Sequence, residues 1–288
     1  MRSRLACFGV VLALLLAFFV TLTTADCPAS EYLAPFGCVC YTKDRVRCRN
    51  VDDERRLRLI MTACEGHELM EFELRNATLK WLPDQLLRTI NTRDFILSYS
   101  TLSSITKPSN NSRLFESSGV KTFVLDHTVI EDGDLSHIAD LDELEDLAIR
   151  GYQMNLFFAP IARSLDENHL RSLMLEDNPG LVLGEKTLQK FWRLTFLSLS
   201  GQHLQSVSRE DLPETVDLLE NLWLKNNQLR EIPPEFLLHM PRLQTLDISN
   251  NSITTLDEDT FRMFHGSLGL HGTVLDRSTV KYIYNFFC

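Results

Sequence analysis

The sequence predicts an α/β solenoid, in which repeated units of one short strand and one outer segment stack to form a single parallel sheet. Leucine accounts for 49 of the 288 residues, and an apolar pattern, L-x-x-L-x-L-x-x-N-x-L, recurs at intervals of 22 to 28 residues. Within each copy, apolar and other residues alternate with the period of two that a strand imposes. A unit of this length cannot bury its apolar face alone, so neighbouring units must share one core.

Composition excludes several other classes of protein. The chain carries 29 Lys and Arg against 39 Asp and Glu, a formal net charge of −10, so it has no basic excess to neutralise a nucleic acid. Its hydrophobic fraction of 44% is ordinary for a packed protein and argues against disorder.

Residues 1–25 are predicted to be a signal peptide. Arg2 and Arg4 form a basic start, an apolar run from Leu5 to Leu22 follows, and small residues end at Ala25. We expect cleavage, secretion and no membrane insertion afterwards. The alternative is a retained signal anchor, because the apolar run is nearly long enough to span a bilayer.

Residues 26–68 are predicted to form an N-terminal cap. Cys27, Cys38, Cys40 and Cys48 lie close together, which in a secreted protein indicates a disulfide framework. The alternative, a zinc site, is disfavoured because the spacing contains no C-x-x-C pair and no companion histidine.

A short helix is expected to close the cap. Asp52 and Asp53 precede the segment from Arg55 to Cys64, where apolar residues recur at helical spacing. We expect this helix to cover the first strand of the solenoid.

Residues 69–288 contain about nine repeats. The cleanest copies are LLENLWLKNNQL, residues 218–229, and LQTLDISNNSI, residues 243–253. The second apolar position of each copy is expected to point into the core: Phe72, Phe95, Phe123, Leu147, Leu173, Leu197, Leu222, Leu246 and Leu268. Outer segments such as LPDQLL and IPPEFLL supply apolar residues to close the other side of the core.

A ladder position follows each strand. Asn178, Asn227 and Asn251 occupy it in three copies, where a side-chain amide can pair with backbone groups freed as the chain turns out of the strand. The other copies have a different residue there: Ala77, Ser100, Thr128, Tyr152, Gln202 and Thr273.

With its repeats and its cysteine-bearing cap, the chain resembles the extracellular leucine-rich-repeat proteins, and this resemblance implies a horseshoe with a concave parallel sheet. More narrowly, CPASEYLAPFGCVCYTKDRVRC followed by LKNNQLREIPPEFL is similar to arthropod secreted proteins related to the non-catalytic subunit of oplophorus-luciferin monooxygenase. The resemblance implies disulfides Cys27–Cys40 and Cys38–Cys48, whereas four cysteines alone permit three pairings. The chain departs from many relatives at its C-terminus, where it has only Cys288.

No enzyme, cofactor or metal site is expected. The sequence lacks a G-x-S-x-G turn, an H-E-x-x-H pair, a phosphate-binding loop and a dinucleotide fingerprint. An acidic stretch, residues 131–146, is interpreted as a solvated loop, with a docking patch for a basic partner as the alternative.

The outward residues of the strands are the candidate partner-binding surface, because strand pairing aligns them into rows. One row is apolar where a solvated face would be polar, and an exposed apolar band favours a protein contact. Its alternatives are coverage by an insertion or glycan, or a repeat frame that is off by one. The candidate binding residues are Ile96, Val124, Ala148, Met174, Phe196 and Trp223.

Three sequons, at Asn76, Asn110 and Asn250, are predicted glycosylation sites on the secretory route. Cys64 and Cys288 remain after the cap cysteines pair. They lie too far apart along the stack to bond to each other, so we expect a Cys288-linked dimer or a chain truncated in its C-terminal cap.

Together these features predict a secreted, non-catalytic scaffold that binds an extracellular protein ligand or receptor, in a matrix, adhesion or accessory-subunit role. The first alternative is a protein of innate immune recognition. The second, implied only by the narrower resemblance, is an accessory subunit of a secreted oxidoreductase.

Overall fold

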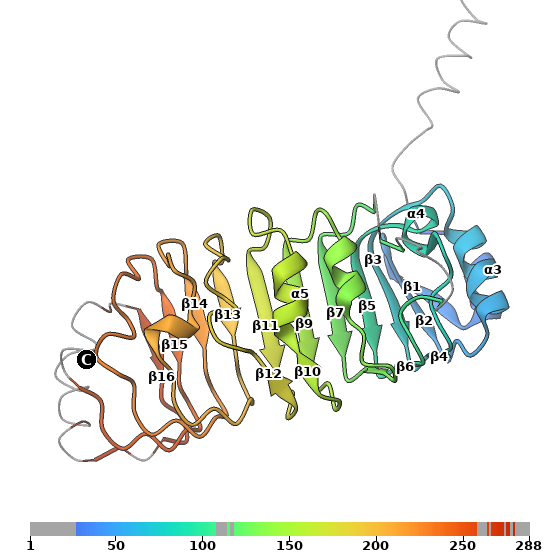
Figure 1. Cartoon of the computed structure of the whole chain (residues 1–288). Helices are drawn as coiled ribbons and strands as arrows, with labels where there is room; N and C mark the ends of the chain where they lie inside the picture. Colours follow the sequence, from blue (N-terminus) through green and yellow to red (C-terminus); the bar gives the residue numbers. More distant parts are fainter. Residues whose placement is uncertain are drawn as a thin grey trace, which may run out of the picture.

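The computed structural model describes residues 27–107, 114–115, 118–257, 264, 266–273, 275–276 and 279. Within them, eleven strands form one sheet that runs the length of the molecule (Figure 1). The predicted signal peptide lies outside the described residues. In sheet order the strands are β1 (Cys38–Thr42), β2 (Arg45–Arg49), β3 (Glu68–Arg75), β5 (Asn91–Ser98), β7 (Thr122–Asp126), β9 (Asp146–Arg150), β11 (Ser172–Glu176), β13 (Phe196–Ser198), β14 (Asn221–Trp223), β15 (Thr245–Asp247) and β16 (Ser267–Gly269).

The predicted repeat frame is confirmed by the strand register. From β3 to β16 all pairs are parallel, and the nine positions expected to point into the core, from Phe72 to Leu268, are register partners from each strand to the next. Phe95 and Leu97 are fully buried while Ile96 between them is half-buried, which is the alternation that the pattern predicted. A frame that is off by one is therefore ruled out.

The connections between the parallel strands lie on one side of the sheet, because such crossovers are almost always right-handed. These connections, and the segment before β1, contain short elements of up to seven residues that the periodicity did not predict, since so few residues carry no clear period. Two small parallel sheets are formed by β4 (Thr78–Leu79), β6 (Thr101–Leu102) and β8 (Val129–Ile130), and by β10 (Leu156–Phe157) and β12 (Leu181–Val182). The helical turns are α2 (Ser30–Leu33), η1 (Ala34–Phe36), α4 (Leu86–Thr89), η2 (Ser136–Asp140), α5 (Phe158–Ser164) and η3 (Arg209–Asp211).

The core lies between the sheet and these outer segments. Phe72, Phe95 and Phe123 stack along it, with 6.2 Å and 5.8 Å between successive ring centroids. The outer segments contribute the apolar residues expected of them, and Leu82 and Phe236 are fully buried. We call the sheet face that points away from the core the concave face, and no described helix or strand covers it.

The asparagine ladder satisfies backbone groups as predicted. The Asn227 amide nitrogen donates to the Leu199 and Leu224 carbonyls, each at 2.9 Å, and its oxygen accepts from the Gln202 and Leu204 amides. Each such side chain connects its own unit to the one before it, because its partners lie in the turns that follow both strands.

Other side chains replace asparagine at several ladder positions. The Thr128 hydroxyl donates to the Leu97 carbonyl at 3.0 Å, and the Ser100 hydroxyl accepts from the Ala77 amide at 2.9 Å. The Gln202 amide donates to the Leu175 carbonyl at 2.6 Å. The sequence pattern is degenerate here because any short donor and acceptor can make one of these bonds.

The N-terminal cap differs from the expectation in one respect. The expected helix, α3 (Glu54–Cys64), forms with Asp53 as its N-cap, but it is not what closes the edge of the first repeat strand. The edge of β3 instead pairs with β2, and β1 joins β2 in an antiparallel hairpin. A helix has no free backbone groups along its side, so only another strand can pair with a strand edge.

Two disulfides, Cys27–Cys40 and Cys38–Cys48, hold this hairpin. They are the same pairs that the family resemblance implied. Cys38 and Cys48 are register partners on β1 and β2, so this bond crosses the hairpin directly. A covalent cross-link at the open end of the sheet stabilises the strand that covers the repeats.

Candidate functional site

The concave face presents its outward side chains in rows that cross the strands. The central row lies one residue after each core marker, and its members are register partners: Glu73, Ile96, Val124, Ala148, Met174, Ser198, Trp223, Asp247 and Gly269. The candidate binding residues therefore share one face, with Phe196 in the neighbouring row.

The apolar part of this row is less exposed than the sequence suggested. Ile96, Val124, Met174 and Trp223 are half-buried, and Ala148 is only 5% exposed. The sequence could not predict this coverage, because it depends on long side chains in adjacent rows. The apolar surface is consequently divided into separate patches.

Arg150 divides the apolar row at its middle. Its guanidinium Nη2 lies 2.9 Å from the Met174 sulfur, and its Nε lies 3.3 Å from the Glu176 carboxylate. The Ser198 hydroxyl donates to the same carboxylate at 2.5 Å. A charged network thus borders Met174, and this surface is amphipathic.

Phe196 and Trp223 form an aromatic pair on adjacent strands. Their rings meet edge to face with 4.8 Å between centroids, and the Lys225 ammonium lies 4.8 Å from the centre of the Trp223 ring. The indole Nε1 has no hydrogen-bond partner among the described residues. Large rings held by such contacts need little further ordering on binding, so the pair is a suitable anchor for a partner.

An acidic group flanks the apolar row in the N-terminal half. Asp94, Thr122 and Asp146 are register partners, and the Thr122 hydroxyl donates to Asp146 at 3.3 Å. Burial raises the pKa of Asp146 above its ordinary value, and the nearby Glu145 and Asp94 carboxylates raise it further. The row of the concave face that contains these carboxylates is therefore suited to contact hydrogen-bond donors and cations of a partner.

Sequence reasoning missed an arginine surface on the cap. In β2 the alternation R-V-R-C-R places Arg45, Arg47 and Arg49 on the concave side, while Val46 and Cys48 are fully buried. The period of two in this segment was the available signal. It was missed because residues 26–68 were interpreted only as a disulfide cap with a short helix.

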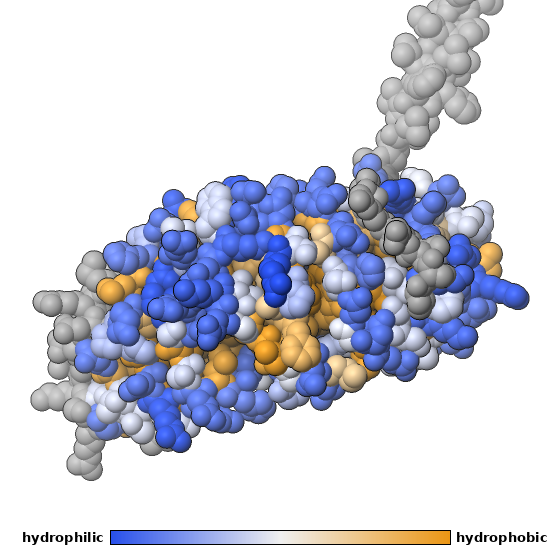
Figure 2. Space-filling model, in the orientation of Figure 1, coloured by the Kyte–Doolittle hydropathy of each residue, from blue (hydrophilic) through white to orange (hydrophobic). Residues whose placement is uncertain are grey.

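A second missed surface is apolar and lies on the connecting side. Phe157 and Val182, register partners of β10 and β12, are 59% and 48% exposed, and Met154 nearby is 39% exposed. Figure 2 shows hydrophobic surface where Figure 1 places these two strands. Strands of two residues are too short to show a periodic apolar pattern, so the sequence carried no signal for this surface.

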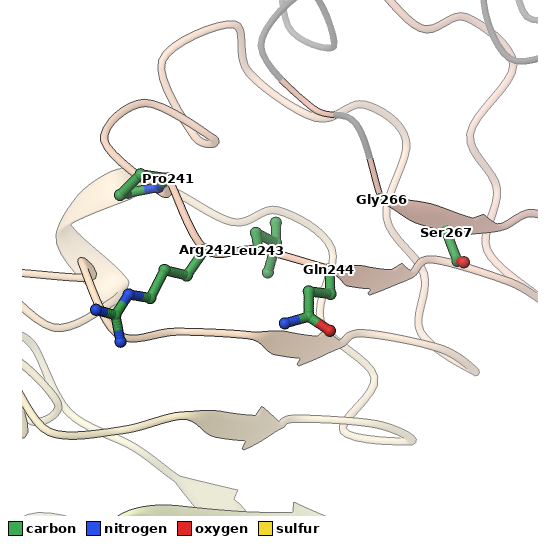
Figure 3. Close-up of a pocket in the computed structure, with 6 residues that line it drawn as sticks. All are labelled: Pro241, Arg242, Leu243, Gln244, Gly266 and Ser267. Atoms are coloured by element: carbon green, nitrogen blue, oxygen red, sulfur yellow. The ribbon is translucent and has the colours of Figure 1, made fainter.

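The ionisable side chains that line one hollow beside the last strands can be named from the described residues. This hollow, of about 540 Å³, lies beside β15 and β16 (Figure 3). Its described lining holds one ionisable side chain, that of Arg242, next to Gln244 and Ser267, and no carboxylate, histidine or cysteine. Among the described residues, no group of three or more His, Cys, Asp or Glu is placed to hold a metal ion.

The sequons at Asn76 and Asn250 lie at equivalent positions, at the end of their strands. Both residues are exposed and left-handed, with φ of 52° and 53°. Asn76 donates to Asn50 at 2.6 Å, and Asn250 donates to Asn226 at 2.9 Å. Asn110 and Cys288 lie outside the described residues.

Cys64 is a buried free thiol on α3, and burial raises its pKa to about 12. The acidic stretch, residues 131–146, contains turns and η2 and ends at the first residue of β9. In its turns the Asp132 and Asp134 carboxylates accept hydrogen bonds from the backbone amides two residues later. Within the described part of the chain, no helix is long and apolar enough to cross a bilayer.

Comparison with known proteins agrees with this architecture. The leucine rich repeat family model matches residues 217–270. Over 87 residues, the chain is 34% identical to human leucine-rich repeat-containing protein 66; the match spans 30% of this chain and 10% of the human protein.

Solved structures show the same fold over most of the chain. A leucine-rich-repeat protein of Leptospira interrogans matches with a TM-score of 0.54 and 18% identity, covering 82% of this chain and 67% of that one. Mouse RP105, in its complex with MD-1, matches with a TM-score of 0.56 and 17% identity, covering 83% of this chain and 44% of that one. The chain therefore has the leucine-rich-repeat fold.

Proposed function

We propose that this chain is a secreted, non-catalytic scaffold that binds a protein partner through the concave face of its leucine-rich repeats. The observation that carries the proposal is the Phe196–Trp223 pair beside Lys225, together with the half-buried Ile96, Val124 and Met174 in the same rows. Aromatic and methionine side chains on a surface bordered by charges are typical of protein contacts.

Two further considerations support a protein ligand. Among the described residues, no helix or strand covers the concave face of the sheet, which suits an extended partner better than a small molecule. The structurally similar mouse RP105 was solved in a complex with MD-1, so a solenoid of this fold there binds another protein.

The secreted location rests on the predicted signal peptide and on the two disulfides of the cap, which persist in oxidising compartments. Asn76 and Asn250 would then carry glycans at one rim of the concave face. Expression in a secreting cell should release a chain that begins at Asp26, and enzymatic deglycosylation should lower its mass. A retained N-terminus or an unchanged mass would contradict these two parts of the proposal.

Affinity capture from extracellular fluid tests the binding function directly. The intact protein should retain a partner that the Met174→Ala, Trp223→Ala double variant loses, because truncation of an interface anchor costs about 1 to 2 kcal/mol or more. A Trp192→Ala variant is the matched control, since this exposed tryptophan lies outside the rows of the concave face. Equal capture by all three proteins would refute the concave-face proposal.

The partner's identity separates the roles within this proposal. A matrix or receptor protein would favour a scaffold, and a microbial or lipid-bearing ligand would favour immune recognition. Capture of a secreted oxidoreductase would favour an accessory subunit.

A further inference from the structure

On the concave face, β2 and β3 place three pairs of charged residues opposite each other, and these pairs alternate with pairs of core residues. Arg45 lies opposite Glu71, Arg47 opposite Glu73, and Arg49 opposite Arg75. Opposite charges on paired strands stabilise a sheet, whereas like charges directly opposite destabilise it. The third pair therefore departs from the rule that the first two follow.

The first two pairs are internally compensated. Arg45 Nη1 lies 3.5 Å from the Glu71 carboxylate, and Arg47 forms a close ion pair with Glu73. The Glu73 side chain is 5% exposed and also accepts a hydrogen bond from Ser98 at 2.5 Å. These two carboxylates consequently have little capacity left for an external cation.

The third pair is not compensated to the same degree. Among the described residues, the only carboxylate that Arg75 reaches is the shared Glu73, at 3.5 Å, and the exposed Arg49 side chain makes no ion pair or hydrogen bond. Within these three pairs four arginines face two glutamates, a surplus of 4 − 2 = +2 on a chain whose formal net charge is −10. The nearest carboxylate of the next strand, Asp94, lies opposite Glu71, at the other end of the row of pairs from Arg49 and Arg75. Arg49 and Arg75 are register partners and keep their charge at all pH values of interest. Two neighbouring guanidinium groups of this kind are suited to bind an anion between them.

Exposed apolar and aromatic side chains lie beside the arginines: Val39 and Tyr41 next to Arg47, and Tyr99 next to Arg75. Val39, Tyr41 and Tyr99 are 51%, 39% and 48% exposed. The Arg47 guanidinium lies 4.6 Å from the Tyr41 ring centre, and that of Arg75 lies 4.6 Å from the Tyr99 ring centre. Stacking on a ring holds a guanidinium in place while its edge stays available to an acceptor.

We propose that Arg49 and Arg75, beside the Tyr99 ring on which Arg75 stacks, bind a carboxylate-bearing segment of the protein partner. This inference rests on the proposed function and adds the chemistry of the ligand. Arginine and tyrosine are the residues that most often anchor protein interfaces. A sulfated polysaccharide is disfavoured as the ligand, because a surplus of two charges on an acidic protein would not offset repulsion of a long polyanion.

Fluorescence anisotropy with a defined probe tests this site. The probe is a short labelled peptide of glutamate and tyrosine, and its control has glutamine in place of every glutamate. We expect the acidic peptide to bind, with weaker binding as salt is added. Arg49→Gln with Arg75→Gln should reduce its affinity about tenfold, the loss of a charged hydrogen bond. Arg230→Gln, an exposed arginine far along the chain, should leave affinity unchanged.

Three outcomes would overturn the proposal: equal binding of the glutamine peptide, full binding by the double variant, or tighter binding of a heparin fragment that displaces the acidic peptide. Thermal melting without peptide separates binding from folding. Arg49→Gln should not lower the melting temperature, because it removes a like-charge neighbour; a large fall would make Arg49 structural and refute its role. Acidic-peptide binding should survive in the Met174→Ala, Trp223→Ala protein, so a failure of the central row is distinguishable from a failure of this site.

Discussion

Phe196 and Trp223 meet edge to face across two adjacent strands, with 4.8 Å between their ring centroids. Phe196 precedes its core marker by one residue and Trp223 follows its own by one, so the contact is diagonal across the rows. Each ring limits the rotation of the other, and Lys225 lies over the indole. The chain thus holds a large apolar surface ready for a partner before the partner arrives.

Phe196→Ala is expected to weaken partner binding without a large loss of stability, because it removes the ring that positions Trp223. Partner affinity should fall by about tenfold, near 1.4 kcal/mol. Tryptophan fluorescence of the free protein should shift to longer wavelength as water reaches the Trp223 indole. A Trp223→Phe variant, which lacks this indole, identifies its share of the signal, and an unchanged spectrum in Phe196→Ala would contradict the positioning role.

Asn227→Ala is expected to lower the free energy of unfolding by about 3 kcal/mol, because it leaves several buried backbone groups without partners. The lost bonds include those to the Leu199 and Leu224 carbonyls. Equilibrium urea unfolding measures the change. Gln228→Ala is the matched control, since that neighbouring side chain is exposed and makes one long contact, to His203 at 3.3 Å. Similar losses of unfolding free energy in both variants would show that the hydrogen bonds of the Asn227 amide do not stabilise the fold as proposed.

The sequence predicted those features that repeat in every unit. The core markers from Phe72 to Leu268 could be aligned because each unit buries an apolar residue at the same position of its strand. The asparagine ladder could be explained because each turn leaves the same backbone groups without partners. Replacement of asparagine by Ser100 or Thr128 weakened the pattern without changing the bond that is made. Periodicity therefore predicts the fold better than residue identity does.

Features that occur once could not be predicted in this way. The packing of Arg150 against Met174 depends on the geometry of two long side chains in neighbouring rows. Coverage of the β3 edge by β2 depends on a hairpin that lies before the first repeat. The sequence therefore predicted that the candidate binding residues share one sheet face, but their partial coverage and the arginines beside them required the structure.

Glu73 is expected to make stability depend on acid pH. Burial would raise its pKa, but hydrogen bonds from Ser98 and Arg47 and the charges of Arg47 and Arg75 lower it below its ordinary value of 4.5. A carboxyl whose pKa is lower in the folded state contributes stability above the unfolded-state value and loses it as pH falls through the folded-state pKa. Glu73→Gln should therefore lower the melting temperature at pH 7 and reduce the further fall below pH 4.5.

Asp146 is expected to have the opposite effect on the melting temperature, because its pKa is raised and that of Glu73 is lowered. Burial is the main cause that raises its pKa above 3.8, so its ionised form costs stability at neutral pH. Asp146→Asn should raise the melting temperature at pH 7 and bring no gain at a pH where the wild-type carboxyl is protonated. A decrease at pH 7 would contradict the inferred direction of the shift.

Cys64 is expected to be unreactive in the folded protein. It is fully buried on α3, and burial raises the pKa of its thiol to about 12, so almost no thiolate exists at pH 8. Because the thiolate is the reactive form, a thiol reagent should label it only after the cap opens. The experiment uses the Cys7→Ser, Cys288→Ser chain, in which the two cap disulfides leave Cys64 as the remaining free cysteine. No labelling in buffer and one label per chain in concentrated guanidinium are expected, whereas rapid labelling in buffer would show that α3 detaches from the repeats under native conditions.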